Sequence, residues 1–142
     1  MRSWWKADGT ATDSAGANNG TLQNGATYAS GISAQAFSFN GSNQYMLVGD
    51  PIPASLQIQN EISLESWIYV TSYPNTTELA TIIGSQRDET FSGATMMLDG
   101  RTNPDGQTAP PGHIHFQIGD GSWHVTNANS AVPLNQWVHV VA

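Results

Sequence analysis

Short apolar runs separated by clusters of turn-forming residues recur along the whole chain. The longest regular pattern lies at 62–70, where side chains alternate between the two sides of an extended backbone. One side carries Ile62, Leu64, Ser66, Ile68 and Val70, and the other carries Ser63, Glu65, Trp67 and Tyr69. Alternation with a period of two predicts a strand with one buried face. The mainly apolar side is expected in the core, which leaves the side with Glu65, Trp67 and Tyr69 as a surface.

The same pattern predicts strands elsewhere in the chain. Ala36–Phe39 and Tyr45–Val48 are expected to form a hairpin around the polar turn at 40–43. Asn24-Gly25 is a favoured two-residue turn between short strands at 21–23 and 26–28. Further strands are predicted at 80–85, 94–98, 113–118, 123–126 and 137–142. About nine strands and no convincing helix predict an all-β fold, an antiparallel two-sheet β-sandwich.

Composition narrows the classes of function. The 142 residues include four Lys and Arg against eleven Asp and Glu, a formal charge of −7, and phosphate recognition needs the opposite sign, so we expect no nucleic-acid partner. The absence of cysteine excludes disulfides, thiolate zinc sites and cysteine nucleophiles. No apolar stretch approaches the roughly 20 residues of a membrane span. Met1 to Trp5 contains no apolar signal core, so any export signal is expected outside this chain.

A set of ordered segments extends over nearly the whole chain. Near the start these are Trp4-Trp5, Asp8-Gly9, Asp13-Ser14 and the run Gly16-Ala17-Asn18-Asn19-Gly20-Thr21. The others are Gln35 to Gly41, Tyr45 to Val48, Ile62 to Ile68 and Gln136 to Val140. Together and in this order, they resemble the segments of bacterial laminin G-like (LamG-like) domains. LamG-like domains belong to the concanavalin A-like lectin/glucanase superfamily. The resemblance therefore implies a jelly roll of two antiparallel sheets.

The resemblance also carries expectations about organisation. It implies one LamG-like jelly-roll domain over residues 1–142, truncated at its C-terminal end, because such domains continue past a strand like 137–142. An uncovered edge strand invites pairing with another molecule, so we expect homo-oligomers to form through this strand. The resemblance further implies a secreted or cell-surface location, as part of an exported bacterial protein.

The leading hypothesis for function is a non-catalytic module that binds carbohydrate or a protein ligand on a cell surface or matrix. The alternative is a structural or adhesive spacer without a small-molecule ligand, and a remote alternative is a glycoside hydrolase. Glucanases of this fold place clustered carboxylates along one strand to supply the acid and the nucleophile. Glu61 and Glu65 lie four residues apart and do not match that spacing, and no other catalytic motif is present. We therefore expect no enzymatic activity.

The candidate ligand-binding surface combines the polar sides of three predicted strands. Aromatic rings stack on the C–H faces of sugars, while carboxylates, amides and imidazoles bind the hydroxyl groups. If the apolar sides face inward, one outward face carries Glu65, Trp67, Tyr69, His113, His115, Gln117, Trp137 and His139. The alternative is that Trp67 and Trp137 belong to the core and that the histidines are ordinary exposed residues.

Two metal sites are also considered. Asp8, Asp13, Asn18 and Asn40 offer the oxygen ligands that calcium prefers, and related jelly rolls often hold a structural calcium at the N-terminal segment. Asn40 stands where the family commonly has aspartate, and the alternative is that all four residues are turn formers. His113 and His115 lie on one side of a strand, about 7 Å apart. A third ligand such as His139 or Glu65 would complete a zinc site.

Overall fold

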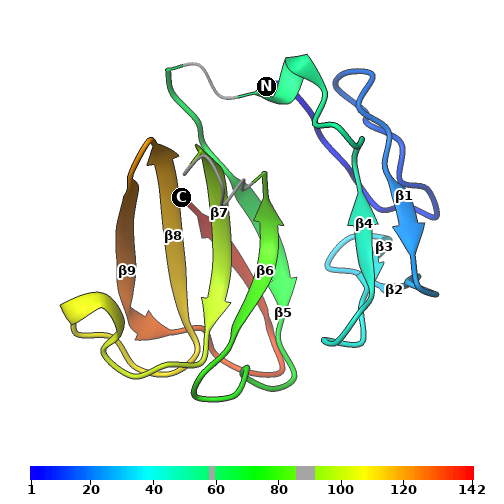
Figure 1. Cartoon of the computed structure of the whole chain (residues 1–142). Coiled ribbons are helices and arrows are strands. Elements are labelled where there is room, and N and C mark those ends of the chain that lie inside the picture. The colour runs from blue at the N-terminus through cyan, green and yellow to red at the C-terminus, as the bar shows by residue number, and fades with distance from the viewer. Residues whose placement is uncertain (58–59, 86–91) are drawn as a thin grey trace. The chain divides into compact units, whose positions relative to one another are not determined.

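The computed structural model describes residues 1–57, 60–85 and 92–142, apart from the side chain of Asp105. The chain divides into two compact units, Met1–Gln57 and Ile58–Ala142, each with its own internal packing. Figure 1 shows that both units are built from antiparallel strands, and the described residues contain only single turns of 3₁₀ helix. None of the described helices is both long enough and apolar enough to cross a membrane.

The first unit contains two short strand pairs. Strands β1 (Thr21–Gln23) and β4 (Tyr45–Leu47) pair with each other, as do β2 (Thr27–Ser30) and β3 (Gln35–Ser38). The predicted hairpin of 36–39 with 45–48 is therefore wrong, although both segments are strands. β3 pairs with β2 and β4 pairs with β1, both of which precede residue 31. Strand pairing depends on packing between distant segments and not only on the turn that joins two neighbours.

Two turns in the first unit follow from local chemistry. Asn24 and Gly25 both have positive φ, 56° and 77°, as a type I′ turn requires, and this confirms the predicted turn. Asn40 accepts hydrogen bonds on Oδ1 from the backbone N–H groups of Ser42, Asn43 and Gln44. This turn closes the 40–43 segment on itself. The unit ends with a 3₁₀ turn, η1 (Ala54–Leu56).

The second unit is a two-layer β-sandwich. One layer is a four-stranded antiparallel sheet in the order β6–β7–β8–β9, and the other is a ribbon of β5 paired with β10. Its elements are β5 (Glu65–Tyr69), β6 (Leu79–Gly84), β7 (Ser92–Asp99), η3 (Pro104–Gly106), β8 (His113–Asp120), β9 (Trp123–Ala131) and β10 (Trp137–Val141). The predicted all-β, antiparallel fold class is confirmed.

The core of this unit lies between its two layers. Met96 and Leu98 of β7 and Val140 of β10 are buried together, and Ile68 of β5 packs against them. Ile114 and Phe116 of β8 also point to this core. The alternation read from the sequence therefore gave the correct inward side for both the 62–70 and the 113–118 segments. The other sides of the two sheets face away from the core, in opposite directions.

Candidate functional site

A group of buried ionisable side chains lies on the outer side of the four-stranded sheet. Asp99 ends β7 and pairs across the sheet with His113, the first residue of β8. His115 follows two residues later, so its side chain points the same way. Asp99 is 0% exposed, His113 0% and His115 2%. We call these three residues the Asp–His cluster.

Distances within the Asp–His cluster are short. Asp99 Oδ2 lies 3.6 Å from His113 Nε2 and 3.6 Å from His115 Nδ1. One potential ligand atom from each of the three residues lies within 4.8 Å of the other two. Among the described residues, this is the one group of three His, Cys, Asp or Glu side chains that meets this condition.

Arg101 holds the carboxylate of Asp99. Its backbone N–H donates to Oδ1 at 2.8 Å, and its guanidinium donates from Nε at 3.0 Å to Oδ1 and from Nη2 at 2.7 Å to Oδ2. Burial by itself raises the pKa of Asp99, but the hydrogen bonds and charge of Arg101, with a further contribution from His113, leave it below the usual value. Asp99 is therefore a carboxylate at neutral pH.

Each histidine of the cluster has one nitrogen directed inward and one outward. His113 Nδ1 lies 2.7 Å from the carbonyl oxygen of Pro110, and His115 Nε2 lies 3.3 Å from Oε1 of Gln117. The inward nitrogens, His113 Nε2 and His115 Nδ1, both approach Oδ1 of Asn127 on β9, at 3.2 and 2.7 Å. Asn127 Nδ2 is buried and has no hydrogen-bond partner.

The connection at 100–112 covers this side of the sheet. Gln107 donates from Nε2 to the carbonyl oxygen of Val125 and accepts from the backbone N–H of Asn127, so the loop is bound to β9. Ala109 is 1% exposed, and its backbone pairs with that of Asn103 to close the loop. The segment has no strand of its own, yet it packs against the sheet and shields the Asp–His cluster from water.

A second arrangement of functional side chains lies on the outer side of the β5–β10 ribbon. The register pairs Trp137 with Tyr69 and His139 with Trp67. The rings of Trp67 and His139 stack at 5.1 Å between centroids, and those of Tyr69 and Trp137 lie tilted at 5.5 Å. Glu65 Oε2 lies 3.6 Å from His139 Nε2. We call these five residues the ribbon face.

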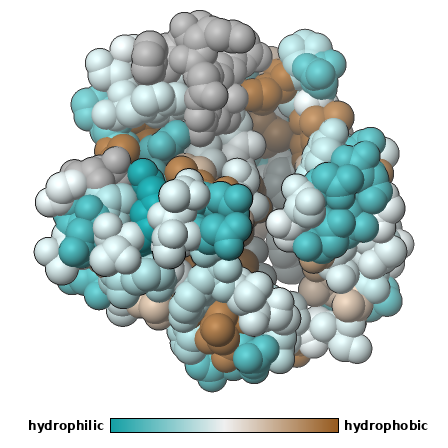
Figure 2. Space-filling model, turned by 60° about the horizontal axis from the view of Figure 1, so that its bottom comes forward, coloured by the Kyte–Doolittle hydropathy of each residue, from teal (hydrophilic) through white to brown (hydrophobic). Residues whose placement is uncertain are grey.

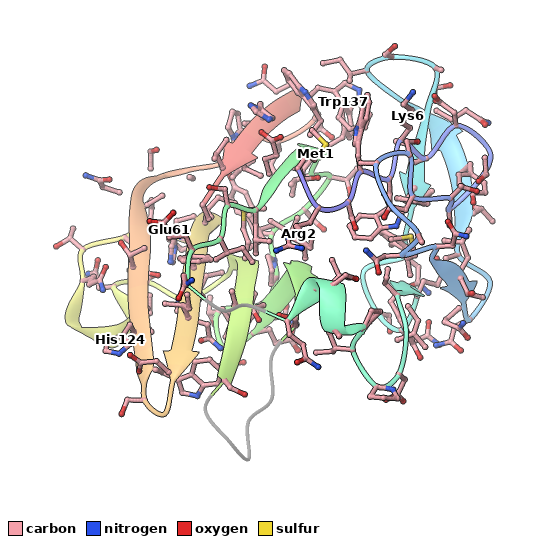
Figure 3. The ribbon with its side chains drawn as sticks, turned by 90° about the horizontal axis from the view of Figure 1, so that it is seen from above. Met1, Arg2, Lys6, Glu61, His124 and Trp137 are labelled. Atoms are coloured by element: carbon pink, nitrogen blue, oxygen red, sulfur yellow. The ribbon has the colours of Figure 1, made fainter. Side chains whose placement is uncertain are left out.

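The ribbon face is accessible to solvent. Trp67 is 50% exposed and Tyr69 46%, high fractions for such large apolar side chains. In the view of Figure 2, apolar side chains form separate small areas among polar ones. Figure 3 shows Trp137 on β10 and His124 on β9, on separate strands of the second unit. The expectation that Trp67 faces away from the core is confirmed.

The structure divides the predicted ligand-binding surface into two parts. Glu65, Trp67, Tyr69, Trp137 and His139 lie together on the ribbon face, whereas His113, His115 and Gln117 belong to the other sheet of the sandwich. The single surface predicted from the sequence is therefore wrong. The alternative of exposed histidines is wrong for His113 and His115, which are buried, and correct for His139, which is 40% exposed. Each sheet has its own outward side, and strand alternation alone does not tell which sheet a strand joins.

The residues predicted as the third zinc ligand, His139 and Glu65, are wrong. His139 and Glu65 are on the ribbon face, so neither joins His113 and His115. The side chain that lies beside both histidines is Asp99, which the sequence analysis missed, as it missed Arg101 and Asn127. The sequence did contain a signal for Asp99. If 94–98 and 113–118 pair as antiparallel neighbours, the residue after the first strand, Asp99, faces the residue that begins the second, His113.

The predicted calcium ligands are engaged in hydrogen bonds of the first unit. Asp13 accepts backbone N–H groups from Trp4, Ala15 and Asn18, and Asp8 accepts that of Gln35. Asn18 donates from its amide to Ser3 and accepts from the hydroxyl of Ser55, and Asn40 closes its own turn. These contacts fit the turn-forming alternative, and calcium binding stays a prediction.

The hydrogen bonds around Asp13 shift its ionisation. Desolvation raises its pKa, but the backbone N–H groups of Trp4, Ala15 and Asn18, together with the Ser3 hydroxyl, outweigh this and hold the pKa far below the usual range. Asp13 is 5% exposed and ionised, so it fixes the N-terminal loop by accepting donors from three parts of it.

Comparison with known proteins relates the chain to a family. A family model described as the concanavalin A-like lectin/glucanases superfamily, of the laminin G type, matches residues 40–142. Neither a search of curated proteins nor a search of solved structures returned a match. The matched segment includes the ribbon face and the Asp–His cluster, and it leaves out residues 1–39, with the whole N-terminal loop around Asp13.

Proposed function

The chain belongs to the concanavalin A-like lectin/glucanase superfamily, and we propose that it is a non-catalytic module that binds carbohydrate through the ribbon face. Laminin G-type members of this superfamily often mediate ligand binding. We further propose that it acts outside the cell, as part of an exported bacterial protein, where glycans of surfaces and matrices are available to it.

The observation that supports this proposal is the side-by-side arrangement of two aromatic pairs. Trp67 with His139 and Tyr69 with Trp137 occupy consecutive rungs on the same side of the ribbon. Such rungs are about 7 Å apart, because each strand rises 3.3–3.4 Å per residue. The faces of the rings offer flat apolar area for the C–H groups of a sugar.

Polar groups beside the rings supply the hydrogen bonds that a sugar needs. Glu65 accepts hydrogen bonds from hydroxyl groups, and His139 either donates or accepts according to its tautomer. Both side chains are accessible, with 60% of Glu65 and 40% of His139 exposed. The ribbon face therefore combines stacking surface and hydrogen-bonding groups without requiring any rearrangement of the backbone.

The ribbon face carries a single carboxylate, which supports binding without hydrolysis. Glycoside cleavage needs an acid and a second carboxylate placed about 5–10 Å apart. Glu65 is the one acidic residue in β5 and β10. This composition of the ribbon supports our proposal of a binding module over the alternative of a glucanase.

A glycan array followed by calorimetric titration of any sugar that binds tests this function. We expect Trp67→Ala and Tyr69→Ala to weaken binding at least about tenfold, equivalent to 1.4 kcal/mol. Tyr45→Ala is the matched control, because Tyr45 is 48% exposed and Tyr69 46%, but Tyr45 lies on β4. Loss of binding in all three variants alike, or no sugar bound by the wild type, would reject the proposal and leave the protein-ligand or spacer alternatives.

A further inference from the structure

We propose that Asp99, His113 and His115 form a buried binding site for Zn²⁺, independent of the ribbon face. All three residues belong to the paired strands β7 and β8, and all are buried. In a tetrahedral zinc site with bonds of 2.0–2.1 Å, neighbouring ligand atoms lie roughly 3.3 Å apart. The two separations of 3.6 Å from Asp99 Oδ2 to the imidazole nitrogens approach this value.

The hydrogen bonds around the histidines prepare their inner nitrogens for a cation. The carbonyl oxygen of Pro110 can only accept, so the proton of a neutral His113 lies on Nδ1 and its lone pair on Nε2 points inward. In His115, Nε2 faces the amide oxygen of Gln117, which leaves the lone pair on Nδ1. Metal-binding histidines commonly donate their outer N–H in this way.

Asn127 provides a second, independent observation. Its Oδ1 lies 2.7 Å from His115 Nδ1 and 3.2 Å from His113 Nε2, and its Nδ2 has no hydrogen-bond partner. An amide oxygen can only accept, so with these tautomers it faces two nitrogen lone pairs and makes a hydrogen bond with neither. A cation among these atoms removes the conflict, and Asn127 Oδ1 or a water then takes the fourth position. The metal-free alternative is an amide turned by 180°, whose N–H₂ group donates to both histidines.

The donor set selects the class of metal. Two neutral imidazoles and one carboxylate suit zinc and other late first-row divalent ions, whereas calcium and magnesium prefer oxygen ligands. The cluster is shielded by the 100–112 loop, and a closed, buried position is typical of structural zinc. Bound zinc would link the end of β7 to the start of β8. If Asn127 Oδ1 takes the fourth position, it would link β9 to them as well.

Arg101 competes with the metal for Asp99. Its Nη2 donates to the same Oδ2 atom at 2.7 Å, and its positive charge repels a cation. The Arg101 side chain is 30% exposed, so the guanidinium is able to move toward solvent when the metal binds. Replacing Arg101 with an uncharged residue is therefore expected to tighten zinc binding, an effect that a purely structural ion pair would not produce.

The test uses the full chain after treatment with a chelator. We expect one equivalent of Zn²⁺ to bind in competition with a chromophoric chelator and, at a hundredfold excess over Kd, to raise Tm by about 10 °C. Co²⁺ is expected to give the visible absorption of a four-coordinate site. No rise in Tm and no cobalt absorption in the wild type would overturn the proposal in favour of the turned Asn127 amide.

Variants locate the metal. His115→Gln is expected to weaken zinc binding at least about 100-fold, and Arg101→Met to strengthen it several-fold. His124→Gln is the matched control, because His124 is also beside an aspartate, Asp120, at 2.9 Å, but is 62% exposed. Binding lost equally in His124→Gln and His115→Gln would assign the metal to the surface. Sugar binding by the ribbon face is to be measured both with and without chelator. Sugar binding that persists with chelator supports the ribbon face whether or not zinc binds, so the two proposals can fail separately.

Discussion

The contribution of the Asp99–Arg101 pair to stability is open to a quantitative test by a double-mutant cycle. The variants are Asp99→Asn, Arg101→Met and the double replacement, each measured with chelator present so that metal does not contribute. Asp99 is wholly buried and accepts three side-chain hydrogen bonds from the guanidinium of Arg101, at 2.7 to 3.1 Å. Charge-assisted hydrogen bonds of this kind are the strong ones.

The size of each effect follows from the exposure of the two partners. Removing one partner of a buried ion pair costs about 3–5 kcal/mol. Since the Arg101 side chain is 30% exposed and Asp99 keeps the backbone N–H of residue 101, we expect Arg101→Met to cost about 3 kcal/mol, the lower end of that range. Asp99→Asn keeps the shape and one acceptor, so about 2 kcal/mol is expected. The coupling free energy should then be about 2 kcal/mol.

Hydrogen exchange of the β7 and β8 backbone amides, together with urea unfolding, measures these free energies within the second unit. The Asp120–His124 pair serves as the reference, because both side chains are more than half exposed and no measurable coupling is expected there. A coupling at Asp99–Arg101 no larger than at this surface pair would refute the reasoning. It would mean that water, and not the protein, solvates the Asp99 carboxylate.

Further predictions concern the first unit, one glycine and the ribbon edge. Because the pKa of Asp13 lies far below the usual 3.8, its contribution to stability is present above about pH 3.8 and is lost as pH falls toward the lowered pKa. Asp13→Asn should therefore be less stable at neutral pH and show a flatter acid limb by fluorescence, and parallel acid limbs would argue against this. If the N-terminal loop binds calcium, added calcium should raise Tm, and Asp13→Ala should remove this rise. An unchanged Tm would mean that the predicted calcium ligands serve only to form turns. Gly112→Ala should destabilise the second unit by more than about 1 kcal/mol in urea unfolding, since φ is +83° and the new methyl would overlap the ring of Tyr73; a neutral effect would contradict that packing. Among the described strands β10 pairs only with β5, so self-association is expected to increase with concentration in light scattering, and a constant monomer mass would count against it.

The sequence by itself determined the strands and their sides. Period-two alternation depends only on neighbouring residues, so Ile68 and Phe116 were placed in the core and Trp67 on the surface without knowledge of the fold. The turn at Asn24-Gly25 followed for the same reason, because positive φ at both positions is a local property of those residues. The order of segments also indicated the superfamily that the comparison then showed.

Only the tertiary structure decided which strands are partners and which outward sides coincide. The 36–39 segment pairs with a strand before it and not with 45–48, because pairing is settled by contacts between distant parts of the chain. His113 and Trp67 both point away from the core, yet they lie on opposite layers of the second unit. The Asp–His cluster forms because the 100–112 connection returns the chain antiparallel and sets Asp99 against His113 in a place that water does not reach.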